Sequence, residues 1–156
     1  MVKALGFLLL LFILISCKRT GVNCECVPPK TLGGNWYFVG YVKADKISIN
    51  EVKPQHPFET YIQLDEMTKK MEGKMAVNLI SANYIFLNRT NDYRGNDLIF
   101  NQLGATKIAV TDSQGAFELL FFEKLLKVTS YEITNEGNLL LYDKKPNTDE
   151  TMIFRR

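Results

Sequence analysis

The chain has few of the residues on which catalytic and metal sites depend. It has one histidine, one tryptophan and three cysteines in 156 residues. The histidine, His56, lies between Pro54 and Pro57, so we expect it in a solvated loop. No serine or cysteine stands in a recognisable nucleophile motif, and phosphate-binding glycine loops and metal-ligand spacings are missing. These features disfavour an enzyme and predict neither a cofactor nor a metal.

The sequence also lacks an excess of charge of either sign. It has 19 Lys and Arg against 17 Asp and Glu. Because nucleic-acid-binding proteins usually have a clustered basic face, we expect no nucleic-acid partner. The acidic pairs Asp65-Glu66 and Asp149-Glu150 fall in turn-like segments, which favours solvated carboxylates over catalytic ones.

One long apolar run is present, at the start of the chain. A basic start is followed by a leucine-rich, uncharged run over 4–15 and then by Ser16 and Cys17. A membrane span needs about 20 apolar residues, and this run is shorter. It resembles a bacterial lipoprotein signal peptide, which implies that residues 1–16 are removed and that Cys17 carries the lipid. An uncleaved membrane anchor and ordinary secretion are the alternatives.

The expected lipid on Cys17 makes the membrane the first predicted partner. Each buried CH₂ of an acyl chain contributes about 0.8 kcal/mol to anchoring. The next residue is Lys18, not the aspartate that retains bacterial lipoproteins in the inner membrane. We therefore expect a lipid-anchored protein of the bacterial cell envelope, at the outer membrane, with its leaflet left open.

Residues 17–33 are predicted to form a flexible tether, since they include two adjacent prolines. If Cys17 is lipidated, Cys24 and Cys26 are the remaining thiols. We interpret them as linker cysteines without a role in a site. A strained disulfide, pairing with another chain and a soft-metal site are the alternatives.

The rest of the chain predicts one mainly β domain over 34–156. Strand-like runs alternate with turn residues at 36–42, 58–64, 71–77, 84–87, 98–100, 128–134, 139–143 and 151–155. Gly73 interrupts one run and indicates a bulge or a close approach of two backbones. Because closing a sheet removes its exposed edges, we expect a small antiparallel, barrel-like curled sheet. The segment 43–57 has no clear assignment.

One packed helix is predicted over about 113–127. Five apolar side chains are expected to form its buried stripe: Phe117, Leu120, Phe121, Leu125 and Leu126. Either Asp112 or Ser113 is expected to cap its N-terminus. The helix should cover one end or one face of the sheet.

The order of C-terminal motifs resembles a known family. After Glu118 and an apolar helix come Tyr131-Glu132-Ile133, a turn, a Leu-x-Leu pair and Phe154-Arg155. This order is similar to that of the META domain family, also called HslJ-like, over roughly residues 34–156. The resemblance implies a fold of lipocalin-like character. The family is associated with the bacterial envelope, heat-shock regulation and tolerance to some antibiotics, and its molecular activity is poorly defined.

The resemblance also implies structural roles for particular residues. Six positions match family motifs: Trp36, Asn78, Tyr84, Thr106, Tyr131 and Phe154. Val77 and Val110 stand where relatives carry cysteine. We expect these two valines to be in contact, so that packing replaces a crosslink typically worth about 2–4 kcal/mol.

The sequence therefore favours a membrane-anchored, noncatalytic envelope lipoprotein with a structural, stress-related or protein-interaction role. A periplasmic barrel that binds a small apolar ligand is the alternative, and an enzyme is less favoured. A packed interior favours the first hypothesis, whereas an internal cavity of a few hundred Å³ favours the second. An exposed apolar patch indicates protein contacts.

Overall fold

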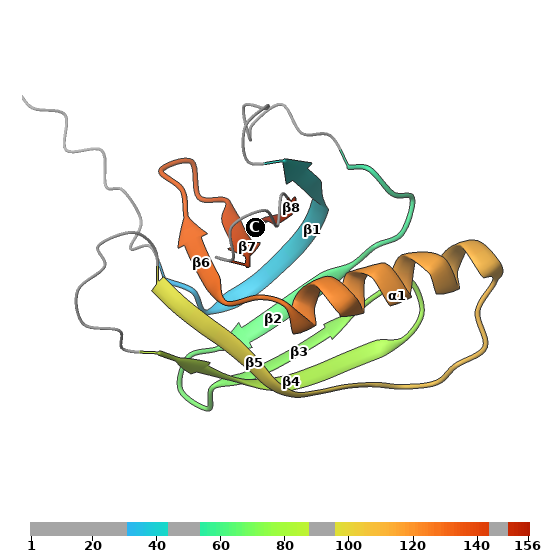
Figure 1. The fold of residues 1–156 in the computed structure, drawn as a ribbon, viewed down its shortest axis with the longest axis horizontal. Coiled ribbons are helices and arrows are strands. Elements are labelled where there is room, and N and C mark those ends of the chain that lie inside the picture. Colours follow the sequence, from blue (N-terminus) through green and yellow to red (C-terminus); the bar gives the residue numbers. More distant parts are fainter. Residues whose placement is uncertain (1–30, 44–53, 88–95, 144–149) are drawn as a thin grey trace, which may run out of the picture.

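The computed structural model describes residues 31–43, 54–87, 96–143 and 150–156. This part of the chain is mainly antiparallel β with one helix, as predicted (Figure 1). The strands are β1 (Gly34–Lys43), β2 (Tyr61–Asp65), β3 (Lys70–Lys74), β4 (Leu79–Phe86), β5 (Asn96–Ala105), β6 (Ser130–Ile133), β7 (Leu139–Tyr142) and β8 (Glu150–Arg155). The helix α1 (Asp112–Leu126) lies between β5 and β6. The signal segment 1–16, Cys17, Cys24 and Cys26 lie outside the described residues.

The eight strands form a ring in which each strand pairs with the next and β8 pairs with β1. Local turn chemistry supports this order. In the β2–β3 turn, Asp65 Oδ1 accepts hydrogen bonds from the backbone N–H groups of Met67 and Thr68. In the β6–β7 turn, Gly137 has φ +81°, a conformation that favours glycine. The two strand-like runs predicted at 128–134 and 139–143 are thus joined as an antiparallel hairpin.

The interior of the ring is filled with large apolar side chains. Twelve of them are fully buried: Trp36, Ile62, Leu64, Met71, Tyr84, Leu98, Phe121, Leu125, Leu139, Leu141, Met152 and Phe154. They belong to one cluster, which joins strands around the ring to the helix. The cluster also includes Leu32, so the packed part of the chain begins two residues before the predicted boundary at 34.

Aromatic residues occupy both even-numbered and odd-numbered positions of β1, and the pairing of β1 with β8 explains how both can contact the core. Trp36 and Phe38 are buried in the core, whereas Tyr37 is exposed. The register with β8 shifts between Phe38 and Gly40, which marks a bulge. After the shift, Tyr41 packs against the core although its parity is that of Tyr37.

The predicted helix is confirmed, but its cap is not. Neither Asp112 nor Ser113 is the N-cap, and that prediction is wrong. Thr111 has an extended backbone, and its side chain accepts a hydrogen bond from the N–H of Gln114. The Gln114 side chain in turn accepts from the N–H of Thr111, which completes a capping box.

The buried stripe of α1 is narrower than predicted. Phe121 and Leu125 are fully buried, and Phe117 packs against the core. Leu120 and Leu126 are exposed, so their assignment to the core is wrong. At about 100° per residue, these two leucines lie about 100° and 140° away from Phe121 around the helix axis.

Gly73 marks a close approach of β3 to β2, one of the two predicted alternatives. A Cβ atom at this position would lie 2.4 Å from the carbonyl oxygen of Tyr61. Gly104, in contrast, has no atom within 4 Å of its Cβ position. Packing therefore requires glycine at position 73 but not at position 104.

Candidate functional site

A buried carboxylate joins α1 to the β3–β4 connection. The side chain of Glu118 is only 6% exposed. Its Oε1 accepts hydrogen bonds from the N–H groups of Val77 (2.7 Å) and Asn78 (2.8 Å). Its Oε2 accepts from Nδ2 of Asn78 at 2.7 Å. The helix is thus tied to a connection about 40 residues upstream.

Asn78 extends this contact to the segment that follows β5. Its Oδ1 accepts hydrogen bonds from Oγ1 of Thr106 (2.9 Å) and the N–H of Ile108 (2.7 Å). The N–H of Leu79 also donates to Oγ1 of Thr106 at 3.0 Å. Two of the six motif residues, Asn78 and Thr106, therefore bond directly to each other.

The ionisation of Glu118 agrees with a structural role. Burial alone would raise the pKa of its carboxyl group, but the hydrogen bonds from Asn78 and Val77 outweigh burial and lower the pKa. The ionised carboxylate is already occupied by three donors. We therefore interpret the Glu118, Asn78 and Thr106 contacts as a joint that fixes the helix, and we call it the helix joint.

The other motif residues also contribute to packing. Trp36, Tyr84 and Phe154 are fully buried, and Tyr131 packs partly buried against the core. Nε1 of Trp36 donates to the carbonyl oxygen of Leu32 at 2.7 Å. The hydroxyl group of Tyr84 likewise donates to the carbonyl oxygen of Asp65 at 2.9 Å, so both buried polar aromatic side chains have a hydrogen-bond partner.

The predicted contact between Val77 and Val110 stays a prediction. Two hydrogen bonds join Asn78, the residue after Val77, to Ile108, which lies two residues before Val110. The two valines are thus near this contact in the sequence.

His56 is not the fully solvated loop residue that its neighbours in the sequence indicate. Its ring is half-buried and stacks on Phe38 with ring centroids 5.0 Å apart, and it lies 4.8 Å from the ring of Phe117. Burial lowers the pKa of the imidazole, although backbone hydrogen bonds to Phe38 and Phe58 oppose the shift. The two flanking phenylalanines indicate a packing role, since a catalytic histidine needs a nucleophile and an orienting group nearby.

The described members of the two acidic pairs have partners within the fold. Asp65 is occupied in the β2–β3 turn, where hydrogen bonds from Thr68 and Met67 lower the pKa of its carboxyl group. Glu66 accepts a hydrogen bond from the N–H of Gly33. Asp149 lies outside the described residues, and Glu150 forms an ion pair with Lys124 of α1. Within the described ranges, no three His, Cys, Asp or Glu side chains are grouped as a metal site requires.

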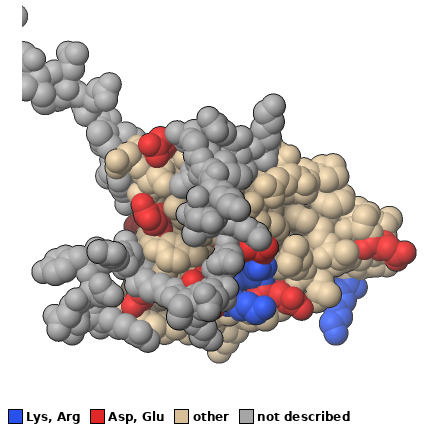
Figure 2. All heavy atoms as spheres, turned by 45° about the horizontal axis from the view of Figure 1, so that its top comes forward, with Lys and Arg blue, Asp and Glu red and all other residues tan. Residues whose placement is uncertain are grey.

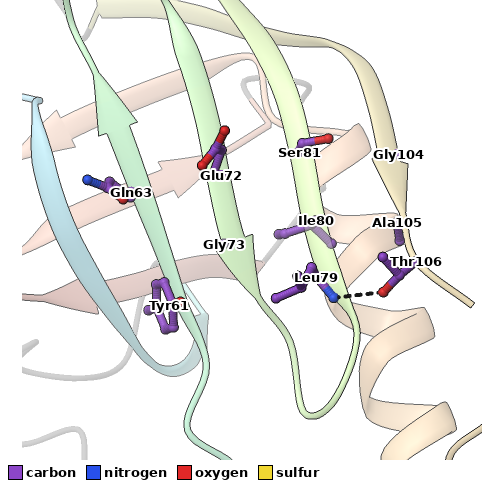
Figure 3. Close-up of a pocket in the computed structure, with 10 residues that line it drawn as sticks. All are labelled: Tyr61, Gln63, Glu72, Gly73, Leu79, Ile80, Ser81, Gly104, Ala105 and Thr106. Atoms are coloured by element: carbon purple, nitrogen blue, oxygen red, sulfur yellow. Dashed lines mark hydrogen bonds between the residues drawn. The ribbon is translucent and has the colours of Figure 1, made fainter. Parts of the chain in front are cut away.

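A hollow of about 680 Å³ lies on the outer face of strands β2 to β5 (Figure 3). Its polar lining includes Gln63 on β2, Glu72 on β3 and Ser81 on β4, together with Thr106 after β5. Tyr61 and Leu79 provide apolar surface beside them. Because the core side chains fill the inside of the ring, this hollow is a candidate ligand surface on the outside of the sheet.

The helix presents a second candidate surface, on the side of α1 that faces away from the core. Leu119 is 61% exposed, Leu126 is 55% exposed and Leu120 is 40% exposed. We call these three residues the leucine face. A helix that is apolar on both sides normally has both sides covered. In the part of the chain that the structure describes, α1 does not have the length and apolarity to cross a membrane.

Charged side chains on the face drawn in Figure 2 are of mixed sign. Lys and Arg lie beside Asp and Glu and do not gather into a basic patch there. This distribution matches the nearly balanced counts of the whole sequence.

Comparisons with known proteins give the fold but no family. No protein-family model and no curated protein matches the chain. Among solved structures, an NMR structure of a protein from Burkholderia xenovorans is similar, with a TM-score of 0.54 and 17% sequence identity. The match covers 79% of this chain and 81% of that chain. At this identity the similarity concerns the fold alone.

We predict that Glu118→Gln lowers the free energy of unfolding by about 1–3 kcal/mol, because an amide in place of the carboxylate leaves a buried donor without its acceptor. Urea denaturation of the full chain at pH 7 measures this loss. Glu123→Gln, at an exposed position of the same helix, is the control and should change stability by less than about 0.5 kcal/mol.

The same variant has an expected pH signature. Since the pKa of Glu118 is lowered in the folded protein, its contribution is complete above the pKa of the unfolded chain, near 4.5, and is lost as the pH falls through the lower folded pKa. The difference in stability between wild type and Glu118→Gln should therefore shrink below about pH 4.5. An equal difference at pH 7 and in acid would contradict the role of the ionised carboxylate.

Proposed function

We propose that this protein is a noncatalytic lipoprotein of the bacterial cell envelope that is anchored through Cys17 and acts through contacts on its outer surface. The lipobox-like sequence supports the anchor and an outer-membrane location. The motif order supports membership of the META family. A structural, stress-related or protein-interaction role fits this setting.

The filled interior is the observation that carries the proposal. Inward-facing side chains from around the ring form one cluster with Phe121 and Leu125 of the helix. Contacts with other molecules are therefore to be sought on the outside. The leucine face supports a protein partner in particular, because exposed apolar surface on one side of a helix is typical of interaction sites.

The lack of catalysis is supported by the positions of the candidate groups. Glu118 is held by three donors, and Asp65 caps a turn. The ring of His56 stacks on Phe38 and packs at a tilt against Phe117. Each of these side chains has an evident role in the fold. Perturbed pKa values are found at structural networks as well as at active sites, so they do not revive the enzyme hypothesis here.

We further propose that the closed sheet is a small barrel of lipocalin-like character. The unbroken strand pairing around the ring supports this description. The alternative function, binding of a small apolar ligand inside the barrel, requires interior space that the packed side chains of this protein occupy.

The lipid anchor is tested by Cys17→Ala. We expect the variant to be released from the membrane or mislocalised in the producing bacterium, because the acyl chains that hold the protein would have no attachment site. Fractionation and immunoblotting measure the distribution, with Cys24→Ala as the control that stays membrane-bound. Unchanged membrane retention of Cys17→Ala would contradict the proposed anchor.

The protein-interaction role is tested by changing the leucine face. We expect Leu119→Lys combined with Leu126→Lys to abolish crosslinked species that wild type forms in intact cells, because two charges would replace the apolar contact surface. Met67→Lys is the control, since Met67 is 95% exposed in the β2–β3 turn, away from α1. Crosslinks that persist in the double variant, or that are absent from wild type, would refute a partner at this face.

A further inference from the structure

The hollow in Figure 3 has a regular arrangement of polar side chains. Gln63 pairs with Glu72, and Glu72 pairs with Ser81, so the three lie in one row across β2, β3 and β4. Two strand spacings separate the ends of this row, which is a length of about 10 Å. The row thus presents an amide, a carboxylate and a hydroxyl group at even intervals on an outer face.

A second row lies directly beside the polar row and contains apolar side chains and one lysine. Tyr37 pairs with Tyr61 in the β1–β2 register, and their ring centroids are 6.0 Å apart. Tyr61 pairs with Lys74 on β3, and Lys74 pairs with the half-exposed Leu79 on β4. A ligand in the hollow would therefore have the ring of Tyr61 beside it on one side and the hydrogen-bonding groups of the polar row on the other.

The surroundings of the hollow restrict the class of ligand. Strands β2, β3 and β4 are each paired along both edges, so a peptide cannot add here as an extra strand. Glu72 is the only acid or base among the lining side chains apart from the tyrosine hydroxyl, and Lys74 lies two residues further along β3 on the same face. The face therefore has one charge of each sign here, which favours a neutral ligand over a strongly charged one. The hollow is partly open to solvent, which suits part of a longer chain better than an enclosed small molecule.

We propose that this hollow is a binding site for a neutral glycan chain. A pyranose ring has an apolar C–H face, which packs on Tyr61, and hydroxyl groups around its rim. Those hydroxyl groups donate to the carboxylate of Glu72 and exchange hydrogen bonds with Gln63 and Ser81. The site is independent of the lipid on Cys17 and of the leucine face.

Gly104 is a position at which a larger side chain would block the hollow without disturbing the core. It lines the hollow, and its Cβ position meets no atom within 4 Å. Its φ does not lie in the left-handed region, so a side chain is compatible with the backbone. A leucine at this position would therefore occupy the hollow while leaving the fold intact.

Isothermal titration of the full chain tests the proposal, in a detergent without a sugar head group. The probes are hexasaccharides of glucose, mannose and N-acetylglucosamine. At least one neutral hexasaccharide should bind, and Tyr61→Ala, Glu72→Ala and Gly104→Leu should each weaken that binding about tenfold or more. Urea denaturation should show that Gly104→Leu folds as stably as wild type.

Glu132→Ala is the matched control, because Glu132 is an exposed carboxylate on β6, outside the hollow. It should bind the same hexasaccharide as wild type does. The proposal would be overturned if no neutral hexasaccharide binds, if the three hollow variants bind as wild type does, or if only a cationic probe such as tetralysine binds.

The result of the glycan titration can be distinguished from the results of the experiments that test the proposed function. Loss of Cys17→Ala from the membrane concerns the anchor alone, and crosslinking through the leucine face concerns α1 alone. Failure of the glycan titration would remove the site on β2 to β5 and leave the envelope proposal standing.

Discussion

The carboxylate of Glu118 is the interaction on which the arrangement of helix and sheet depends. A charged group is costly to bury unless hydrogen bonds replace its water shell. Here the backbone of Val77 and the backbone and amide of Asn78 provide that replacement. Because these donors belong to the β3–β4 connection, the joint sets where α1 lies along the sheet. With α1 in that place, Phe121 and Leu125 enter the core that the strands surround.

Because the core is packed, the surfaces available to other molecules lie on the outside of the protein. There the protein offers two contrasting areas, which belong to different elements. The leucine face of α1 is apolar, whereas the hollow on β2 to β5 combines tyrosine and leucine with a row of polar side chains. A helix that is apolar on both sides is thus a structural element on one side and a contact surface on the other. This division is the basis for the proposal that the protein acts through contacts on its outer surface.

Much of the fold could be predicted from local patterns. The mainly antiparallel β class and the approximate places of the strands follow from alternation and turn residues, and the helix follows from a four-residue apolar repeat. The outward position of Leu120 and Leu126 could not be predicted in the same way, because both faces of α1 are apolar. The cap was also missed, although Thr111 and Gln114 have the spacing of a capping box.

The candidate site was less accessible from the sequence than the fold. Asn78 and Thr106 were recognised as motif residues, but their hydrogen bond joins positions 28 residues apart and is visible only in three dimensions. The hollow depends on the register that places Gln63, Glu72 and Ser81 in one row. It also depends on β5, where Gln102 has φ +55° without any local signal for this conformation. The sequence of each strand alone does not show which of its residues will lie beside those of the neighbouring strands.

The central claim is that side chains fill the interior of the ring, and Trp36 provides a direct test of it. It is the only tryptophan of the chain, and it is fully buried in the core. The most direct measurement is the emission spectrum of Trp36 while the full chain is titrated with a long-chain fatty acid below its micelle concentration. A packed interior predicts no saturable change in the emission. A saturable shift at one fatty acid per chain would contradict this account and favour an internal ligand site.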